Sequence, residues 1–245
     1  ISNRLPVKVS EKNGTFSFTR SEGGLATGLD SLQTSYEKHW IGWPGICVDN
    51  DSDKQAIGEK LEELNFHPVF LSDTQIKNYY EGYSNSTIWP LCHYFFAYTL
   101  YKDTFWQAYR EVNRRFCETI CRLIGPEDKV WVQDYQLMLL PGMLREAVPD
   151  LCIGYFHHIP FPSYELFRIL PERAEILKGL LGADFIAFHT HDYMRHFISA
   201  VERVLRMNFK LDEIQLGNRI VRIDALPMGI NYDLYHNAST QPEVR

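Results

Sequence analysis

The sequence lacks the features that mark membrane proteins and nucleic-acid binders. No apolar run approaches the roughly 20 residues that a membrane-spanning helix needs, and no signal peptide is visible. The 245 residues carry 25 basic against 31 acidic side chains, a formal net charge of −6. A nucleic-acid-binding domain would usually carry a basic stripe. We therefore expect a protein that binds neither nucleic acid nor membrane.

Cysteine is scarce, and its placement excludes a disulfide scaffold. The five cysteines are an odd number in apolar or helical surroundings, which favours reduced thiols in a cytoplasmic protein. Cys117 and Cys121 lie four apart in an expected helix and could suit a metal, but buried small hydrophobes are the better interpretation. The spacing of His157, His158 and the later histidines does not demand the three or four converging ligands of a zinc site. The sequence predicts no metal and no cofactor.

Apolar runs alternate with helical stretches along the chain. Apolar residues make up 45% and charged residues 23%, near the averages for a soluble globular domain. The apolar character of each run is continuous, which is typical of parallel strands covered on both faces. The expected strands are Trp40–Trp43, Pro68–Leu71, Lys129–Gln133, Cys152–Phe156, Asp184–Phe188 and Ile220–Ala225, with a first strand of which Ile1 is the only residue present.

Helical patterns fill the intervals between the strands. The expected helices are Leu25–Tyr36, Asp53–Leu64, Asp73–Tyr80, Thr104–Leu123, Gln136–Arg145, Pro171–Leu181 and Thr190–Met207. Alternating strands and helices imply parallel pairing with right-handed crossovers. We therefore expect one doubly wound, mostly parallel α/β domain.

Three polar residues follow strand-like runs and are the leading site candidates. Arg4 follows the apolar start of the chain, Asp134 follows Lys129–Gln133, and His158 follows the run that ends at His157. In an open parallel sheet, ligands bind in the crevice outside the carboxyl ends of the strands. A cation, an anion and an imidazole delivered to one such edge favour a polar ligand that is phosphorylated or rich in hydroxyl groups.

Each of these residues also has an ordinary structural interpretation. The guanidinium of Arg4 can hold phosphate oxygens bidentately, or it can pair with an acidic side chain. Asp134 can hold sugar hydroxyls or act as a base, and it can also cap the helix that follows. Adjacent residues of a strand point to opposite faces, so at most one of His157 and His158 faces the crevice, and His158 is nearer the strand end.

Aromatic and glycine-rich segments supply further candidates. Tyr80 and Trp89 flank a polar stretch, Ser84-Asn85-Ser86, which we expect to be a loop, and Trp43 lies in an expected turn at a strand end. Rings with a polar handle suit a sugar phosphate, although ordinary core packing is as consistent with composition. Gly23-Gly24 lies in a glycine-rich turn that enters a helix, where backbone N–H groups can approach an anionic ligand; a plain loop tip is the alternative.

Seven segments, in order, resemble the trehalose-6-phosphate synthase family. They are Ile1–Pro6, Gly23-Gly24-Leu25, Gly42–Gly45, Tyr80 with Trp89-Pro90, Trp131–Tyr135, His158–Pro162 and Pro227–Ile230. The resemblance covers almost the whole chain. It implies a retaining glucosyltransferase of the GT-B architecture, with two facing Rossmann-like lobes, of which residues 1–245 are the N-terminal, acceptor-binding lobe. The C-terminal nucleotide-sugar lobe would begin about where this chain stops.

The resemblance also implies a reaction and a role for each matching residue. Glucose would move from a nucleotide sugar, UDP-glucose in most members, to glucose 6-phosphate, giving α,α-trehalose 6-phosphate with retention. The implied acceptor-site residues are Arg4, which holds the phosphate, Trp43, Tyr80, Trp89 and Asp134. The implied donor-site residues are Gly23, Gly24 and His158. Asp134 and His158 would carry the catalytic roles, and no side chain of this lobe needs to act as a nucleophile.

The alternatives left open concern the parent protein. The same lobe could belong to a non-catalytic regulatory or sugar-phosphate-sensing relative, or to another GT-B transferase such as a glycogen-synthase-like enzyme. We expect the isolated lobe to be inactive, since the missing C-terminal lobe would supply the donor contacts. Whether the protein forms a homo-oligomer is left open by the sequence.

Overall fold

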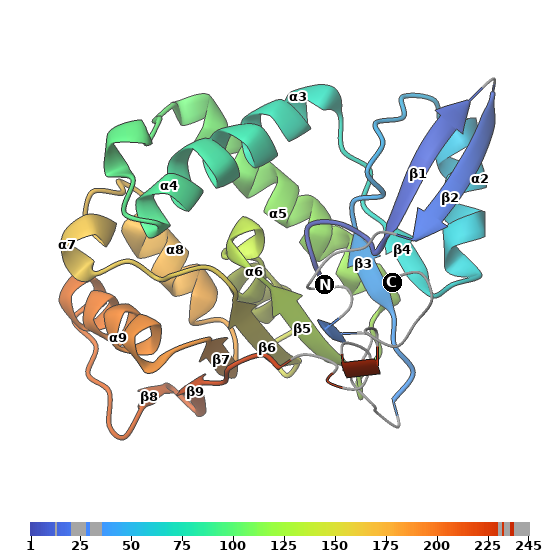
Figure 1. The fold of residues 1–245 in the computed structure, drawn as a ribbon. Helices are drawn as coiled ribbons and strands as arrows, with labels where there is room; N and C mark the ends of the chain where they lie inside the picture. The colour runs from blue at the N-terminus through green and yellow to red at the C-terminus, as the bar shows by residue number, and fades with distance from the viewer. Residues whose placement is uncertain (13, 21–27, 30–35, 230–231, 233–235, 238–245) are drawn as a thin grey trace.

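A mostly parallel five-stranded sheet occupies the second half of the chain. The computed structural model describes residues 1–12, 14–20, 28–29, 36–229, 232 and 236–237. The strands are β5 (Lys129–Gln133), β6 (Cys152–His157), β7 (Phe185–Phe188), β9 (Arg219–Ala225) and β8 (Glu213–Leu216), in that spatial order. The first four pair in parallel and β8 pairs antiparallel with β9. The predicted mostly parallel α/β sheet is confirmed (Figure 1).

The first residues of the chain join this sheet to a second strand pair. β3 (Trp40–Gly42) and β4 (Phe66–Pro68) are parallel neighbours. On one side of the initial segment the Ser2 amide donates to Ile41 O at 3.1 Å, and on the other the Gln133 amide donates to Ile1 O at 2.9 Å. Residues 1–5 therefore run between β3 and β5 and connect them through backbone hydrogen bonds, with a single parallel bridge between Arg4 and Trp43. The chain order reverses there, which is where doubly wound sheets bind ligands.

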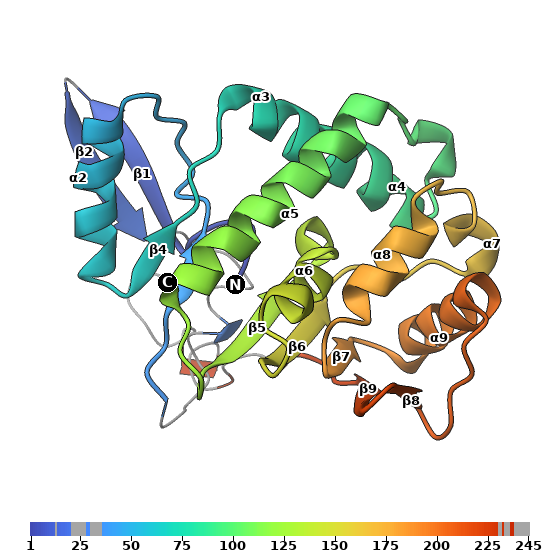
Figure 2. The same ribbon diagram turned by 180° about the vertical axis from the view of Figure 1, so that it is seen from behind.

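Helices cover one face of the five-stranded sheet. α5 (Asp103–Leu123), α6 (Leu140–Ala147), α8 (Arg173–Leu180) and α9 (His191–Leu205) lie over one face of the five-stranded sheet, as Figure 2 shows. Alternate strand residues point into this core and are buried, among them Val130, Val132, Ile153 and Tyr155. Glycines allow α6 and the end of α8 to approach closely: a Cβ added at Gly182 would lie 2.4 Å from the Gly142 Cα.

A second, smaller core lies beside β3 and β4. The hairpin of β1 (Val7–Lys12) and β2 (Thr15–Arg20) packs with α2 (Asp51–Glu62). Its buried residues are Leu5, Val7, Val9, Ile57 and Leu61. The sequence interpretation missed this hairpin and β8. Alternating apolar and polar residues around the Asn-Gly pair at 13–14 are a hairpin signal that could have revealed it.

The segment after β4 differs from its prediction. Instead of a helix over Asp73–Tyr80 followed by a loop, α3 (Asp73–Gln75) continues into the π-helix η1 (Ile76–Ile88) and α4 (Trp89–Cys92). Ser84-Asn85-Ser86 is therefore helical, and the loop prediction was wrong. β4 also lies two residues before the predicted Pro68–Leu71, although the Val69 amide still donates to Gly42 O at 2.8 Å.

The remaining helices are short or end near their predicted bounds. η2 (Phe96–Tyr98), η3 (Tyr135–Leu137) and α7 (Tyr164–Phe167) are single turns. The Thr190 side chain caps α9 by accepting from the Tyr193 amide, as predicted. None of the helices in the described ranges is both long and apolar enough to cross a bilayer.

Candidate functional site

Arg4 is an exposed cation held by aromatic rings. Its guanidinium carbon lies 4.6 Å from the centroid of the Trp43 ring and 5.9 Å from that of Tyr80. It forms no ion pair with any acidic residue in the described part of the chain. Stacking on rings orients a guanidinium without neutralising its charge. The ion-pair interpretation of Arg4 is therefore not what the structure shows, and the fork is free to bind an anion.

Trp43 supports Arg4 from behind. Only 5% of the Trp43 side chain is exposed, and its indole N–H donates to Ile46 O at 3.1 Å. Its polar group is therefore already satisfied. The predicted role of Trp43 beside the acceptor stays a prediction, and the geometry favours a role through Arg4.

Asp134 follows β5 in a strained backbone conformation. Its φ of 71° and ψ of 173° lie in a region populated almost only by glycine, which costs a residue with a side chain roughly 1–3 kcal/mol. Its amide donates to Phe156 O at 2.8 Å, and Oδ1 accepts from the His158 amide at 3.0 Å. Although a short helix follows at once, the carboxylate does not cap it through the second or third residue, as an ordinary N-cap side chain would. The strain aims the carboxylate across the sheet edge toward β6.

Burial decides the charge of Asp134. It raises the pKa of the carboxyl to about 6, although the backbone N–H groups of His158, Tyr135 and Ile159 oppose the shift. Such a carboxyl changes protonation close to neutral pH and is a functional-site candidate on physical grounds. It can accept hydrogen bonds from hydroxyl groups or exchange a proton with them.

His158 lies against Asp134 and is neutral. Its Nε2 is 2.8 Å from Gln133 Oε1, and its ring lies 4.4 Å from Phe156 and 5.5 Å from His189, measured between centroids. Burial, followed by the nearby His189, lowers the pKa of His158 to about 4. At neutral pH the ring is therefore an uncharged hydrogen-bonding group.

His157 faces the opposite way, as the strand alternation predicted. It is fully buried, its Nδ1 lies 2.9 Å from the Tyr155 hydroxyl, and burial lowers its pKa to about 3. It packs against Phe161 and Phe188 as a core residue. Among the described residues no group of three or more histidine, cysteine, aspartate or glutamate side chains is arranged to hold a metal.

Hydrogen bonds between neighbouring segments place two groups at the same edge of the sheet. One is Arg4 with the rings of Trp43 and Tyr80, and the other is the Asp134–His158 pair. The N-terminal amine donates to Trp131 O at 2.8 Å and Ile1 O accepts from Gln133, so Ile1 lies beside Val132 in parallel register. Continuing this register puts Asn3 beside Asp134 and Arg4 one residue beyond. The predicted meeting of the cation, the carboxylate and the imidazole at one edge is consistent with this arrangement.

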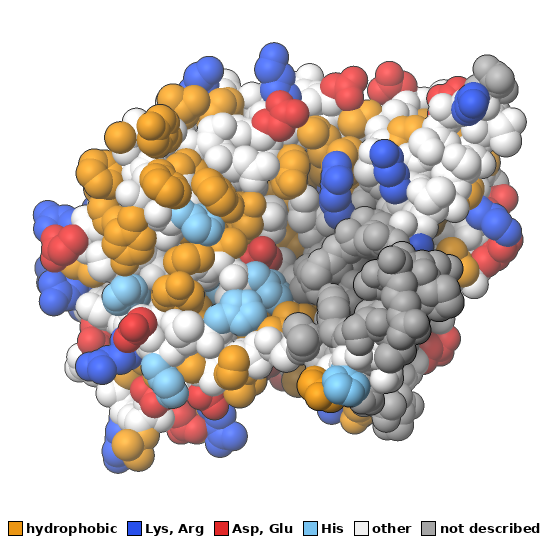
Figure 3. All heavy atoms as spheres, viewed as in Figure 1, with side chains coloured by type: hydrophobic (Ala, Val, Ile, Leu, Met, Phe, Trp, Pro, Cys, Tyr) orange, Lys and Arg blue, Asp and Glu red, His pale blue; other side chains and the backbone are white. Residues whose placement is uncertain are grey.

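Trp89 approaches the same edge from α4. It is 40% exposed, and its ring stacks on His93 with centroids 4.1 Å apart. Further along α4, burial raises the pKa of the Cys92 thiol and the charge of Asp134 raises it further, so this helix lies near the carboxylate. Figure 3 shows histidines gathered near the middle of this face beside a broad apolar area. Gly23 and Gly24 lie outside the described residues.

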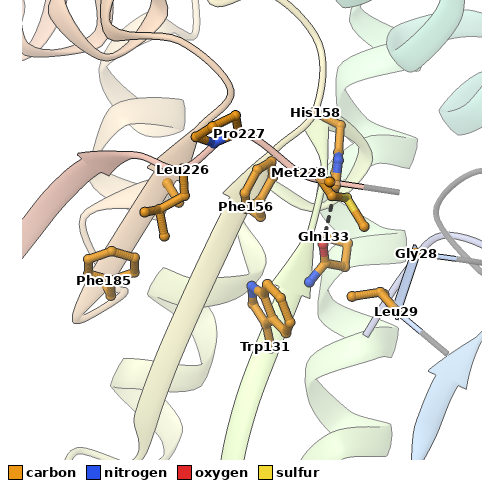
Figure 4. A pocket seen from close by; sticks show the side chains of 12 residues that line it. Gly28, Leu29, Trp131, Gln133, Phe156, His158, Phe185, Leu226, Pro227 and Met228 are labelled. Atoms are coloured by element: carbon orange, nitrogen blue, oxygen red, sulfur yellow. Dashed lines mark hydrogen bonds between the residues drawn. The ribbon is translucent and has the colours of Figure 1, made fainter. Parts of the chain in front are cut away.

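A cavity of about 360 Å³ opens next to His158 (Figure 4). Its walls are mainly apolar and come from β5, β6, β7 and the segment after β9. Besides His158, the lining residues are Trp131, Gln133, Phe156, Phe185, Ala187, Leu226, Pro227, Met228, Gly229, Gly28 and Leu29. His158 and Gln133 are the polar side chains among them. The cavity runs along one face of the sheet, from Phe185 at the start of β7 to His158 just beyond the end of β6, so only part of it lies at the strand ends, where ligands of open parallel sheets bind.

The sequence interpretation missed two residues that shape this site. Tyr79 is fully buried and donates from its hydroxyl to Asn3 Oδ1 at 2.9 Å, which ties η1 to the first strand. Gln133 contacts His158 directly. A polar residue at the end of an otherwise apolar strand was the available signal for Gln133, and no short-range pattern marks Tyr79.

Comparison with known proteins identifies relatives over the entire chain. The model of glycosyltransferase family 20 matches residues 1–245. The α,α-trehalose-phosphate synthase (UDP-forming) 56 kDa subunit of Kluyveromyces lactis is 45% identical over 251 residues, which cover 100% of this chain and 51% of that protein. The chain thus spans about half the length of the curated relatives it matches.

Solved structures share the same fold. The N-terminal domain of Candida albicans trehalose-6-phosphate phosphatase superposes with a TM-score of 0.82 at 30% identity, covering 99% of this chain and 50% of that one. A UDP-forming α,α-trehalose-phosphate synthase from Burkholderia xenovorans gives a TM-score of 0.78 at 28% identity, covering 100% and 51%. The chain therefore belongs to glycosyltransferase family 20, the family of its trehalose-phosphate synthase relatives.

Proposed function

We propose that this chain is the N-terminal, acceptor-binding lobe of a longer retaining glucosyltransferase. The enzyme would transfer glucose from UDP-glucose to glucose 6-phosphate and produce α,α-trehalose 6-phosphate. The observation that carries the proposal is the placement of Arg4 and the Asp134–His158 pair at the same edge of the sheet. An exposed, unneutralised guanidinium lies one strand away from a buried carboxylate–imidazole pair.

The two groups divide the acceptor between them. Arg4 would bind the phosphate, because a planar guanidinium pairs bidentately with phosphate oxygens. Asp134 would accept hydrogen bonds from sugar hydroxyls. The chain as a whole carries a charge of −6, so attraction of an anionic acceptor has to come from the local charge of Arg4. Tyr80 and Trp89 supply ring surface beside a sugar.

The proposed chemistry is displacement on the front face of the donor sugar. The bond from C1 to the leaving phosphate breaks as the acceptor oxygen approaches, and the leaving phosphate oxygen takes the acceptor proton. No protein nucleophile is required, so the enzyme contributes positioning and charge stabilisation. His158, uncharged at neutral pH, would contact the donor glucose, while Asp134 orients the acceptor.

The remaining donor contacts, to the pyrophosphate and the ribose, belong to the proposed second lobe. The matched relatives are about twice as long as this chain. An enzyme assembled from two facing lobes needs both for turnover, so we expect the 245-residue chain alone to form no trehalose 6-phosphate. Detectable trehalose 6-phosphate formed by this chain alone would contradict the proposal that both lobes are required.

Replacing Arg4 tests the phosphate assignment. In the full-length protein, Arg4→Ala should raise the KM for glucose 6-phosphate by the value of a charged hydrogen bond, roughly 2–3 kcal/mol or 30- to 150-fold. The KM for UDP-glucose should change little. Lys8→Ala, which removes an exposed cation from β1, is the matched control. An unchanged KM in a folded Arg4→Ala protein would refute the assignment.

One observation favours a second candidate, a sugar-phosphate-sensing relative. The same fold forms the N-terminal domain of a protein named as a phosphatase, so the fold does not by itself establish a synthase. A sensor would bind glucose 6-phosphate without consuming it. Trehalose 6-phosphate formation by the full-length protein, measured with both substrates present, distinguishes the two.

A further inference from the structure

Gln133 is a buried polar residue whose contacts the proposed reaction does not use. It ends β5 and is only 1% exposed. Its Oε1 lies 2.8 Å from His158 Nε2, and Figure 4 shows this contact as a dashed line. Its amide nitrogen is buried without a hydrogen-bond partner. An unpaired buried N–H costs roughly 1–3 kcal/mol, so the residue is not explained by stability.

The contact determines which nitrogen of His158 carries the proton. An amide oxygen has lone pairs and no hydrogen, so it can only accept. With the Gln133 amide oriented so that Oε1 faces the ring, the Nε2 atom of His158 donates, and the tautomer measured below tests this orientation. Since the ring is neutral, Nδ1 is then unprotonated and acts as an acceptor. Burial and the neighbouring His189 both disfavour a second proton.

The Nδ1 atom is available to a ligand. It has no hydrogen-bond partner among the described residues, and it is not one of the buried polar atoms that lack a partner, so it reaches solvent. The carboxylate of Asp134 contacts the backbone N–H of His158 and leaves the ring free.

We propose that Gln133 is a positioning residue that holds His158 in the Nε2–H tautomer and presents Nδ1 as a hydrogen-bond acceptor to the ligand. The group bound there must donate a hydrogen bond, which suits a sugar hydroxyl and rejects an ionised phosphate or carboxylate oxygen. The tautomer itself follows from the geometry, whereas the identity of the ligand as a donor sugar rests on the proposed function.

The titratable groups around the ring make the proposal sensitive to one substitution. Asp134 faces His158 from the end of β5, His157 precedes it on β6, and His189 approaches from beyond β7. Gln133→Glu adds a carboxylate opposite Nε2, which stabilises the imidazolium. The pKa of the ring rises, and once the ring is charged both nitrogens carry protons, so Nδ1 is a donor and the acceptor is lost.

Nuclear magnetic resonance of the histidine ring nitrogens measures the tautomer directly. The protein is labelled with ¹⁵N-histidine, and His158→Asn assigns the signal. At pH 7.5 the wild-type ring should show a single Nε2–H tautomer. Gln133→Leu should give a mixture, and Gln133→Glu should form the imidazolium at a higher pH than the wild type does. Gln75→Leu, which alters another buried glutamine that bonds to Ser72 and Glu111, should leave the signal unchanged.

The wild-type spectrum alone can overturn the proposal, whether or not the variants fold. An Nδ1–H tautomer or a charged ring at pH 7.5 would do so, as would a Gln133→Leu spectrum identical to that of the wild type. In the full-length enzyme, Gln133→Leu should lower kcat/KM for the nucleotide sugar about ten-fold, the value of one lost hydrogen bond, with the KM for glucose 6-phosphate within about two-fold. Kinetics equal to those of Gln75→Leu would contradict it.

The experiment separates this proposal from the proposed function. The spectrum needs no turnover. If the Nε2–H tautomer is found and the full-length protein transfers no glucose, the role of Gln133 stands and the synthase proposal fails. If glucose is transferred and the tautomer is wrong, the reverse holds.

Discussion

The candidate site has an exposed end, Arg4, and a buried end, the Asp134–His158 pair, and the two differ in how far their side chains are exposed to water. Arg4 is exposed, rests on the rings of Trp43 and Tyr80, and has no carboxylate partner among the described residues. Asp134 and His158 are withdrawn from water, and their pKa values move toward the neutral forms. One end therefore keeps a permanent charge in solvent, whereas the other combines an imidazole that is neutral at pH 7 with a buried carboxyl that titrates near pH 6. The first suits recognition of an anion, and the second suits hydrogen bonding to a polyol.

Substitution of Asp134 should have the largest effect on activity. Asp134→Asn keeps the shape of the side chain but removes the charge and one acceptor. In the full-length protein, kcat/KM should fall roughly 100- to 1,000-fold, the cost of losing one preorganised group at a reaction centre. Steady-state kinetics measures the loss. No covalent glycosyl-enzyme should accumulate, and mass-spectrometric capture of an adduct on Asp134 would contradict the mechanism without a nucleophile.

The same substitution should stabilise the protein. The carboxyl has a pKa of about 6 in the folded protein, against an ordinary value of 3.8, so the folded state binds the proton more tightly. Stability is therefore lost as pH rises through this window, and the penalty is complete above pH 6. It amounts to roughly 3 kcal/mol at 1.36 kcal/mol per pKa unit.

Urea unfolding of the wild type and Asp134→Asn checks this expectation. The variant should be the more stable protein at pH 7.5, and the difference should vanish below about pH 4. Asp150→Asn, on the exposed turn before β6, serves as the control and should show no such pH-dependent gain. A variant that is less stable at pH 7.5 would show that burial of Asp134 carries no penalty.

The exposed end should respond to salt more than to pH. The Debye length falls from about 14 Å at 50 mM to about 4 Å at 500 mM ionic strength, which screens an exposed cation. The KM for glucose 6-phosphate should therefore rise a few-fold over this range. Arg4→Ala should show a flatter dependence, because the charge being screened is gone. Equal salt slopes for the two proteins would place the anion-binding charge elsewhere.

The sequence was most informative where the residues depend on strand geometry alone. β5 occupies the predicted residues, and the ends of β5 and β6 bring Asp134 and His158 into contact as expected. Both results follow from local patterning, since apolar runs predict parallel strands and their carboxyl ends share one edge. The prediction that both faces of these strands are covered was wrong for β5, where Lys129 and Trp131 are exposed.

Features determined by packing were not predictable in this way. The π-helix η1 runs past Gly82, where an added Cβ would lie 2.7 Å from the Phe105 ring, so its path depends on contact with α5. The burial of the Trp43 ring beneath Arg4 also depends on a contact between distant parts of the chain, and its predicted place beside the acceptor stays a prediction. The role of Gln133 likewise depends on a partner 25 positions later in the chain.

The central claim is that Arg4 and Asp134 form one acceptor site. Isothermal titration calorimetry of the full-length protein tests it most directly, with glucose 6-phosphate and glucose as ligands and no nucleotide sugar present. The phosphorylated sugar should bind at one site at least about 30-fold more tightly than glucose, the value of a charged hydrogen bond of about 2 kcal/mol. Arg4→Ala should abolish that preference, and Asp134→Asn should weaken binding of both sugars. Equal affinity for the two sugars in the wild type, or an undiminished preference in Arg4→Ala, would contradict the account.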